Sequence, residues 1–259
     1  MSFDPERISK FQTKIFKWWK TNKREFPWRE TTDPYYIMIS EFMLQQTQTM
    51  RVVPKYLEFI ERFPTPKDLG NAEKIDVLRL WSGLGYNRRA IWLQDAARTV
   101  AEMEEFPSDP TELRKLKGIG RYSSNSILIF AFNADLTTID TNIRKIFVDE
   151  SFLSPDATES HAYMVANQLL PHGKSRDWHN ALMDYGAAFY SKKSPSNGST
   201  RFAGSKRQIR GKIIKLLTKG TPLSVKKLQA EIKHEELESI LEDLVKDGLI
   251  QKINGKYSI

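Results

Sequence analysis

Hydrophobic residues recur at helical spacing along most of the chain. In residues 8–20 the apolar side chains Ile8, Phe11, Ile15 and Trp19 return every three or four positions, which is the period of one face of an α-helix. The same rhythm predicts further helices at residues 35–43, 50–63, 72–82, 87–104, 121–132, 142–152, 158–170 and 178–190. Alternating patterns typical of strands are scarce, and no internal repeat is visible. Residues 1–190 are therefore predicted to form an all-α body with short loops.

A polar stretch separates this body from the end of the chain. Residues 191–205 are rich in Ser, Gly and Lys, a composition typical of a linker. Beyond it the pattern predicts helices at residues 207–218, 225–232 and 235–247 and a hairpin around Asn254-Gly255. Three helices and a hairpin resemble a winged-helix fold, so residues 206–259 are expected to form a small α+β domain. Winged helices serve as DNA readers and as protein-docking modules, and the pattern leaves both roles open.

Length and composition fit a soluble globular protein. With 259 residues the chain is too long for one small helical core, so more than one domain is expected. Hydrophobic residues make up 40% of it, and its mean hydropathy is −0.50. The sequence contains no run of about 18 apolar residues that could span a membrane. Its first residues are charged and lack an apolar signal core, so an intracellular protein without a membrane partner is expected.

Cysteine and histidine usage limits the kinds of catalytic and metal sites that the chain can form. The chain contains no cysteine, which excludes disulfides, thiolate catalysis and any cysteine-ligated zinc or iron–sulfur centre. The four histidines, His161, His172, His179 and His234, show no metal-ligand spacing. We therefore expect neither a metal site nor a cofactor.

Positive charge is concentrated near the C-terminal end. The formal net charge is +8, and residues 201–259 hold 13 Lys and Arg against 7 Asp and Glu, which is +6 of that total. Such asymmetry favours a polyanion as partner. An ordinary solvated basic face would have the same composition.

A glycine turn followed by a carboxylate lies in residues 116–144. Gly118 and Gly120 precede the predicted helix at 121–132, and glycines there allow consecutive backbone N–H groups to point at an anion. Asp140 stands just before the next helix start. A phosphate cradle near a carboxylate suits an enzyme that acts on a nucleic-acid backbone. A plain helical hairpin explains the same glycines, and Asp140 can also serve as a helix N-cap.

Several short motifs together match one known family. They are Pro27-Trp28-Arg29, Asp33-Pro34-Tyr35, SEFMLQQTQ from Ser40 to Gln48, Gly83-Leu84-Gly85-Tyr86, Gly118-Ile119-Gly120-Arg121-Tyr122 and Asp140-Thr141-Asn142. With these motifs, residues 24–190 resemble the helix–hairpin–helix (HhH-GPD) DNA glycosylases, most closely the MutY-type adenine glycosylases. The resemblance implies a two-lobed helical fold with its hairpin at about residues 113–132. It also implies a monomer whose partner is double-stranded DNA containing a mismatch.

The resemblance assigns the reaction to three residues. Cleavage of an N-glycosidic bond builds positive charge on the deoxyribose and negative charge on the departing base. Asp140 is implied as the partner and transient covalent acceptor of the sugar, and Glu41 as the acid that protonates the purine at N7 and positions water. Tyr122 stands where relatives that also nick the backbone carry a lysine, so strong AP lyase activity is not expected. Taken alone, Glu41 would be a partly exposed helix carboxylate and Tyr122 a core aromatic residue.

The same resemblance places two further groups of residues. Because a base inside a duplex is unreachable, the enzyme must flip it out. Gln46 is the implied wedge, Thr47 and Leu84 lie against the opposite base, and Tyr86 intercalates beside it. The residues implied to shape the adenine pocket and hold Asp140 are Trp28, Arg29 and Asn142. The residues expected to contact DNA are Gln45, Gln46, Thr47, Leu84, Tyr86, Gly118, Gly120 and Arg121.

Two departures from the family bear on the expected function. MutY-type enzymes usually carry four cysteines after the core that ligate a [4Fe–4S] cluster, whereas residues 191–205 replace that region here without any cysteine. DNA contacts of that region would fall to Lys192, Lys193 and Arg201. Many relatives also end in a Nudix-like domain that reads 8-oxoguanine, and residues 206–259 are too few for one.

The resemblance implies a base-excision-repair enzyme that hydrolyses adenine from mispairs with 8-oxoguanine or guanine, in the cytoplasm at the nucleoid. A mismatch thymine or uracil glycosylase, acting on T:G or U:G, is the nearest alternative, since such enzymes also carry the tyrosine and the aspartate. The run from Gln45 to Gln48 favours adenine. A non-catalytic HhH DNA-binding protein would give no reason for Glu41, Tyr122 and Asp140 to fall in one register.

Overall fold

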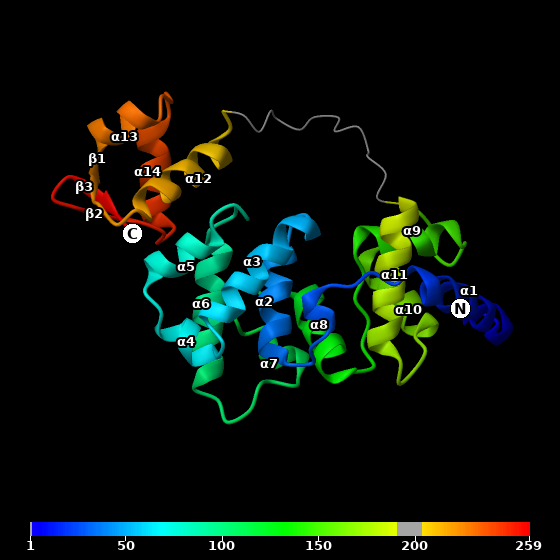
Figure 1. Ribbon diagram of the computed structural model, residues 1–259. Helices are drawn as coiled ribbons and strands as arrows, with labels where there is room; N and C mark the ends of the chain where they lie inside the picture. Colours follow the sequence, from blue (N-terminus) through cyan, green and yellow to red (C-terminus); the bar gives the residue numbers. More distant parts are fainter. Residues whose placement is uncertain (1, 191–203) are drawn as a thin grey trace. The chain divides into compact units, whose positions relative to one another are not determined.

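The described part of the chain folds into helices joined by short loops, with a small sheet near the C-terminus (Figure 1). The structure is a computed structural model that describes residues 2–190 and 204–259. Most of the predicted linker, with Lys192, Lys193 and Arg201, lies outside the described residues. Among the described residues, no helix combines the length and the apolar character needed to cross a membrane.

The predicted fold class, a helical body followed by a small α+β element, is confirmed. The helices before residue 191 are α1 (Pro5–Asn22), η1 (Pro27–Arg29), α2 (Pro34–Leu44), α3 (Thr49–Arg62), α4 (Pro66–Asn71), α5 (Lys74–Trp81), α6 (Arg88–Ala101), α7 (Pro110–Leu113), α8 (Arg121–Phe132), α9 (Thr141–Asp149), α10 (Glu159–Leu169) and α11 (Ser175–Tyr190). The later elements are α12 (Lys206–Leu217), β1 (Leu223–Ser224), α13 (Val225–Glu231), α14 (Leu237–Lys246), β2 (Gln251–Ile253) and β3 (Lys256–Ser258).

The chain packs into two compact units. The first contains Met1–Glu41, Pro107–Lys115 and Ile119–Pro195. The second contains Phe42–Phe106, Leu116–Gly118 and Ser196–Ile259. The division into a body of residues 1–190 and a domain of residues 206–259 stays a prediction, because the second unit draws on both.

Aromatic residues of α1 build the core of the first unit. Phe11 and Trp19 are buried among residues of α9 and α11, and Phe11 meets Trp178 edge-on with 5.5 Å between ring centroids. Burying side chains of this size stabilises a fold by about 1.5–3 kcal/mol each. The core thereby fixes α9, which Asp140 precedes, and α11, which carries Asp184.

Helices α3 to α6 form the body of the second unit. Helix α4 packs along α6, and Gly70 permits the close approach, since a Cβ there would lie 3.0 Å from the Cα of Arg98. Trp81, at the end of α5, is buried and lies 6.2 Å from the ring of Phe59 in α3. Between α5 and α6 runs the loop with the motif Gly83-Leu84-Gly85-Tyr86.

The C-terminal elements form a three-stranded antiparallel sheet in the order β1-β3-β2, beside α12, α13 and α14. The predicted hairpin is present, with Asn254 and Gly255 at φ values of 50° and 72° between β2 and β3. Strand β1, in which Leu223 pairs with Tyr257, was not predicted. Two residues are too few to show an alternating pattern.

Candidate active site

The glycine turn lies between α7 and α8. Gly118 has a φ of +86°, and a Cβ there would lie 2.8 Å from the ring of Phe42 and 2.9 Å from that of Trp92. Packing and backbone conformation therefore both require glycine at this position. Gly120 is the N-cap residue of α8 with a φ of −95°, and a Cβ on it would meet nothing within 4 Å. Gly120 thus leaves open space at the start of α8.

Asp140 caps α9. Its carboxylate accepts hydrogen bonds from the backbone N–H of Ile143, at 2.7 Å, and from that of Asn142. Burial raises the pKa of Asp140 above its ordinary value, and the two N–H groups oppose this rise. The N-cap considered as an alternative is therefore present. A capping carboxylate is also a fixed group at the positive end of a helix, so the two roles are compatible.

Glu41 lies near the end of α2 with only 8% of its surface exposed. Its neighbours in the helix, among them Ile37, Met38 and Phe42, are fully buried. Burial raises the pKa of Glu41 to about 8, although the hydroxyl of Ser126 opposes part of the rise. At neutral pH the carboxyl group therefore carries its proton, the form that can act as an acid. The alternative of a partly exposed helix carboxylate is wrong for this residue.

Tyr122 shares an electrostatic environment with both carboxyl groups. Burial raises the pKa of Tyr122 well above its ordinary value, and the negative charges of Glu41 and Asp140 raise it further. Ser126, one helical turn later in α8, is fully buried and lowers the pKa of both Tyr122 and Glu41. Within the described residues its Oγ makes no hydrogen bond of ordinary geometry. The first unit thus brings Glu41, Tyr122 and Asp140 into one site.

The segment that leads to Asp140 is held by two neighbours. The Thr138 N–H donates to Nε2 of buried His179 at 3.1 Å, and Nδ1 of that ring lies 2.7 Å from the backbone oxygen of Ser175. Because Nε2 accepts, Nδ1 carries the proton, and burial lowers the pKa of His179 to about 4. The Thr138 hydroxyl also donates to the backbone oxygen of Tyr122 at 3.3 Å. The sequence did not predict that His179 holds this segment. Its only signal there is a single histidine within a helical pattern.

The residues predicted for the adenine pocket do not all meet Asp140. Arg29 donates to the two carboxylate oxygens of Asp184, at 2.9 and 3.0 Å. The guanidinium of Arg29 is thus held by Asp184, and its support of Asp140 stays a prediction. Trp28 lies in a stacked aromatic pair, with 5.1 Å between ring centroids and 9° between the planes. Asn142 meets Asp140 through its backbone N–H.

Asp184 is the buried centre of an ion network that the sequence does not reveal. It is 1% exposed and accepts hydrogen bonds from Trp19 Nε1 at 2.8 Å and Arg24 Nε at 2.6 Å, besides those from Arg29. Burial alone would raise the pKa of Asp184, but the hydrogen bonds and charge of Arg29, with those of Arg24, hold it below its ordinary value. The network joins the N-terminal segment to α11, across about 160 residues of chain, so no short motif marks it.

In the second unit Arg89 joins the two loops predicted to contact DNA. It is 4% exposed, and its guanidinium donates to the backbone oxygens of Phe42 and Gln45 at 2.6 and 2.5 Å. It also donates to Thr47 Oγ1 at 3.0 Å and to the backbone oxygen of Gly85 at 3.1 Å. A buried guanidinium surrounded by backbone acceptors rigidifies both loops. Sequence reasoning missed Arg89, because its partners are backbone atoms that carry no sequence signature.

Two residues of these loops adopt left-handed backbone conformations. The φ values are 54° at Gln46 and 48° at Tyr86, which costs a non-glycine residue on the order of 1 kcal/mol. Tyr86 is 41% exposed, whereas Leu84 is 3% exposed. The predicted contact of Leu84 with DNA therefore lacks an exposed side chain. Arg121, predicted to contact DNA, is exposed and stacks 3.6 Å from the ring centroid of Tyr163.

Comparison with known proteins identifies the family. The model of the HhH-GPD superfamily base excision DNA repair proteins matches residues 39–172. The chain belongs to the HhH-GPD superfamily. An adenine DNA glycosylase of Mycolicibacterium smegmatis (strain ATCC 700084 / mc(2)155) is 31% identical over 277 residues, which cover 95% of this chain and 94% of that protein. An adenine DNA glycosylase of Mycobacterium tuberculosis (strain ATCC 25618 / H37Rv) is 29% identical over 292 residues, with coverage of 98% and 94%.

Solved structures agree with this membership. A thermostable thymine-DNA glycosylase matches with a TM-score of 0.66 and 27% identity, over 73% of this chain and 90% of that one. A non-covalent endonuclease III–DNA complex has the same fold, with a TM-score of 0.65 and 19% identity over 75% and 91% of the two chains. Within the HhH-GPD superfamily the chain is of the MutY type, which confirms the predicted resemblance.

This HhH-GPD chain does not fit the iron–sulfur cluster of many MutY-type relatives. Thiolates ligate such clusters, and the chain contains no cysteine. In the described ranges, 2–190 and 204–259, no group of three or more His, Asp or Glu side chains is arranged to hold a metal ion.

Proposed function

We propose that this chain is a DNA glycosylase of base excision repair that removes adenine mispaired with 8-oxoguanine or guanine. The observation that carries the proposal is the buried Glu41, protonated at neutral pH, in one site with Asp140 and Tyr122. An acid and a second, fixed carboxyl group in one site are what cleavage of a glycosidic bond requires. The relatives named adenine DNA glycosylase, matched along nearly their whole length, support adenine as the base.

In the proposed mechanism the two carboxyl groups act on opposite sides of one bond. Glu41 donates its proton to N7 of the flipped adenine, and the bond between N9 and C1′ breaks with its electron pair leaving on the base. Asp140, fixed at the start of α9, stabilises the positive charge that develops on the sugar. Water then adds to C1′ and returns a proton to Glu41. The products are adenine and an abasic site.

Tyr122 limits the proposed reaction to cleavage of the glycosidic bond. A phenol cannot form a Schiff base with the sugar, so the backbone beside the abasic site is not cut by that route. With its pKa raised well above the ordinary value, the hydroxyl of Tyr122 stays protonated and can donate a hydrogen bond near Asp140 or the sugar.

The proposed substrate is double-stranded DNA containing a mismatch, bound by a monomer inside the cell. Gln46 and Tyr86, presented by the loops around Arg89, would enter the base stack. Gly118, Gly120 and Arg121 would meet phosphates. No cofactor takes part in this proposal.

A glycosylase assay on A:8-oxoguanine, A:G, T:G and U:G duplexes tests the function. Adenine release from the first two substrates, with strand breaks only after alkali treatment, is the expected result. The thymine-DNA glycosylase similarity makes thymine or uracil release the second candidate. Release of thymine from T:G with A:8-oxoguanine left intact would replace the proposal with that one. Release of no base from any duplex would leave a DNA-binding protein.

A further inference from the structure

Helix α12 is the basic element of the C-terminal part of the second unit. It carries five basic residues, Lys206, Arg207, Arg210, Lys212 and Lys215, and no acidic residue. A winged-helix DNA reader instead uses the second helix of its helix-turn-helix pair, which here is α14. That helix carries Glu238, Glu242 and Asp243 against one lysine.

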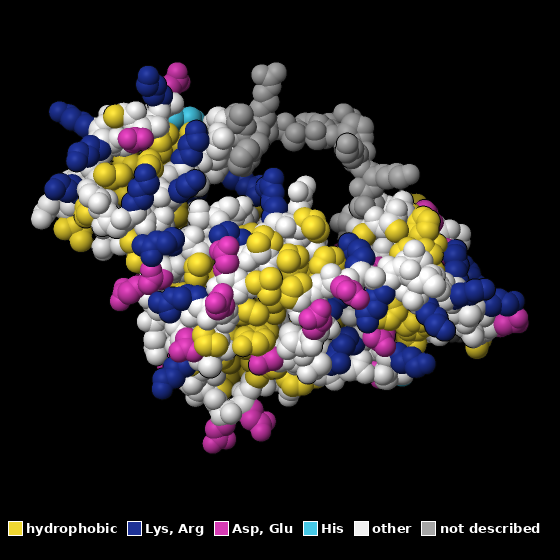
Figure 2. Space-filling view, viewed as in Figure 1, with side chains coloured by type: hydrophobic (Ala, Val, Ile, Leu, Met, Phe, Trp, Pro, Cys, Tyr) yellow, Lys and Arg dark blue, Asp and Glu magenta, His cyan; other side chains and the backbone are white. Residues whose placement is uncertain are grey.

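Helices α12 and α14 carry net charges of opposite sign. All three acidic side chains of α14 are exposed, and phosphates would repel them in a DNA groove. Figure 2 shows more Lys and Arg than Asp and Glu on the visible face of the C-terminal elements. The negative charge of α14 therefore disfavours it as the helix that contacts DNA, whereas the positive charge of α12 favours that helix.

Part of the positive charge on α12 is free of carboxylates. Lys206 pairs with Glu236 at 2.6 Å, and Arg210 pairs with Asp247. Arg207, Lys212 and Lys215 are exposed and form no ion pair with any described residue. The helical period places Lys212 and Lys215 away from the buried residues Ile209, Ile213 and Leu217, whereas Arg207, seven positions before buried Ile214, lies at the edge of the buried side. Lys212 and Lys215, with Arg207 at the start of the helix, are here named the basic face of α12.

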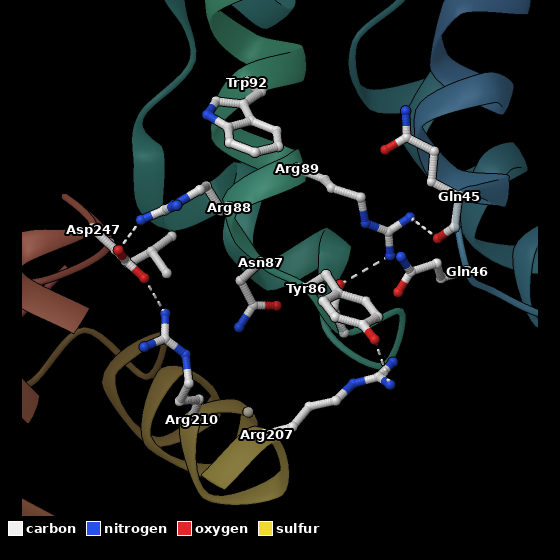
Figure 3. A pocket seen from close by; sticks show the side chains of 13 residues that line it. Gln45, Gln46, Tyr86, Asn87, Arg88, Arg89, Trp92, Arg207, Arg210 and Asp247 are labelled. Atoms are coloured by element: carbon white, nitrogen blue, oxygen red, sulfur yellow. Dashed lines mark hydrogen bonds and ion pairs between the residues drawn. The ribbon is translucent and has the colours of Figure 1, made fainter. Parts of the chain in front are cut away.

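This face begins at the residue predicted to intercalate into DNA. The Arg207 guanidinium lies 3.8 Å from the ring centroid of Tyr86, and its Nη1 donates to the Tyr86 hydroxyl at 3.0 Å. In Figure 3 the ring of Tyr86 lies between Arg207 and Arg89, whose guanidinium is 5.5 Å from the ring centroid. The contact connects the basic helix to the loop that would touch DNA.

The surroundings of Tyr86 concentrate positive charge. A pocket of about 470 Å³ opens there, lined by four arginines, Arg88, Arg89, Arg207 and Arg210, and by one carboxylate, that of Asp247. Arg88 and Arg210 share this carboxylate, as Figure 3 shows. Arg207 and Arg89 have no carboxylate partner among the described residues, and the charge of Arg207, after burial, contributes to lowering the pKa of Arg89 to about 10. The lining of this pocket therefore carries an excess of positive charge, which favours an anion as ligand.

We propose that the C-terminal elements bind the sugar–phosphate backbone of the DNA substrate through α12, with Arg207, Lys212 and Lys215 as the contacts, and not through α14. The inference rests on the proposed function for the identity of the polyanion. It adds that the DNA passes from the loop of Tyr86 onto this helix. Exposed like charges without carboxylate partners gain most from phosphates, because each contact releases counterions from the DNA.

The test compares two triple variants that lose the same charge. In one, Arg207, Lys212 and Lys215 of the full chain are replaced by alanine. In the other, the exposed lysines Lys226, Lys227 and Lys246 of α13 and α14 are replaced by alanine. The dissociation constant for an undamaged 30-bp duplex is measured by fluorescence anisotropy between roughly 50 and 200 mM salt, the range over which phosphate contacts dominate the affinity.

The α12 variant should reduce the slope of log K against log salt by about 2–3, since each lost contact removes about 0.9. The control variant should keep the wild-type slope. A third protein with Arg207→Lys, Lys212→Arg and Lys215→Arg should also keep it, and melting curves of all variants confirm that they fold. Equal slopes in the two alanine variants would reduce α12 to a solvated basic face, and a larger loss in the control would transfer DNA contact to α13 and α14.

The wild-type protein separates this inference from the proposed function. If it excises no base yet binds duplex DNA through α12, the proposed function fails and the surface stands. If it excises adenine while the α12 variant keeps the wild-type slope, the inference fails and the function stands.

Discussion

The carboxylate of Asp140 accepts a 2.7 Å hydrogen bond from the backbone N–H of Ile143. One group thus caps α9 and also lies in the site of Glu41 and Tyr122. The capping role needs an acceptor oxygen, whereas the proposed catalytic role needs a negative charge. Substitution can therefore separate the two.

Asp140→Asn should abolish excision while the protein stays folded. Asparagine caps a helix as well as aspartate does, so the free energy of unfolding should change by less than about 1 kcal/mol. Loss of the charge should lower the single-turnover rate constant by roughly 10³-fold or more, with DNA affinity retained. Asp140→Ala is the matched control, which should lose the cap as well, at a cost of about 1 kcal/mol. Near wild-type turnover in Asp140→Asn would rule out the mechanism.

Glu41 should produce an alkaline limb in the pH profile. With its pKa raised to about 8, the single-turnover rate constant should fall as pH rises through about 8, because the proton donor is lost. Glu41→Gln should remove this limb and lower the rate at pH 7 by about 10²–10⁴-fold. A wild-type profile that is flat up to pH 9.5 would argue against Glu41 as the acid.

The raised pKa of Glu41 also predicts how the free energy of unfolding depends on pH. The folded pKa of about 8 lies above the ordinary value of 4.5, so the stability contributed by the protonated carboxyl group is fully present below pH 4.5 and is lost as pH rises through 8. Urea unfolding should therefore show that Glu41→Gln gains stability relative to wild type between pH 6 and pH 9. A constant difference across this range would mean that the group titrates normally.

Gly118 and Gly120 should respond differently to alanine. At Gly118 a Cβ would lie 2.8 Å from Phe42 at a φ of +86°, so Gly118→Ala should lower the free energy of unfolding by about 1–3 kcal/mol. Gly120→Ala meets no described atom within 4 Å and should cost no more than about 1 kcal/mol, because alanine is a poorer N-cap than glycine at the start of α8. It should weaken duplex binding, however, if a phosphate approaches the start of α8. Unfolding curves and anisotropy titrations of both variants check the contrast.

Asp184 should contribute far more to stability than a surface ion pair. Asp184→Asn leaves Arg24 and the largely buried Arg29 without their carboxylate, which should cost about 3–5 kcal/mol. Lys14→Ala, which breaks the more exposed pair with Glu150, should cost less than about 1 kcal/mol. Because the pKa of Asp184 is held below 3.8, its contribution should be present above pH 3.8 and lost as pH falls further. Equal costs for the two variants in urea unfolding would contradict this account.

Local patterns predicted most of the secondary structure. Apolar periodicity located the long helices, Asn254-Gly255 located the hairpin, and Asp140 before Thr141 was recognised as a helix cap. These features depend on neighbours within a few residues, so a sequence displays them directly. Strand β1 escaped prediction because two residues carry no period.

By contrast, the surroundings of the site residues depend on segments that are distant along the chain. Glu41, which taken alone would be a partly exposed helix carboxylate, is buried, and the guanidinium of Arg29 is bound by Asp184. Arg89 and Arg207 were not recognised, since their partners are backbone oxygens and a tyrosine 121 positions away.

The sequence by itself determined the helical class, the family and the residue types available for chemistry, including the absence of any thiolate ligand. Only the tertiary structure decided that Glu41 keeps its proton at neutral pH, that Asp184 gathers the arginines, and that α12 presents its charge beside Tyr86. The physical reason is that desolvation and charge pairing depend on which segments meet in space, whereas helix periods, caps and turns are set within a few residues along the chain.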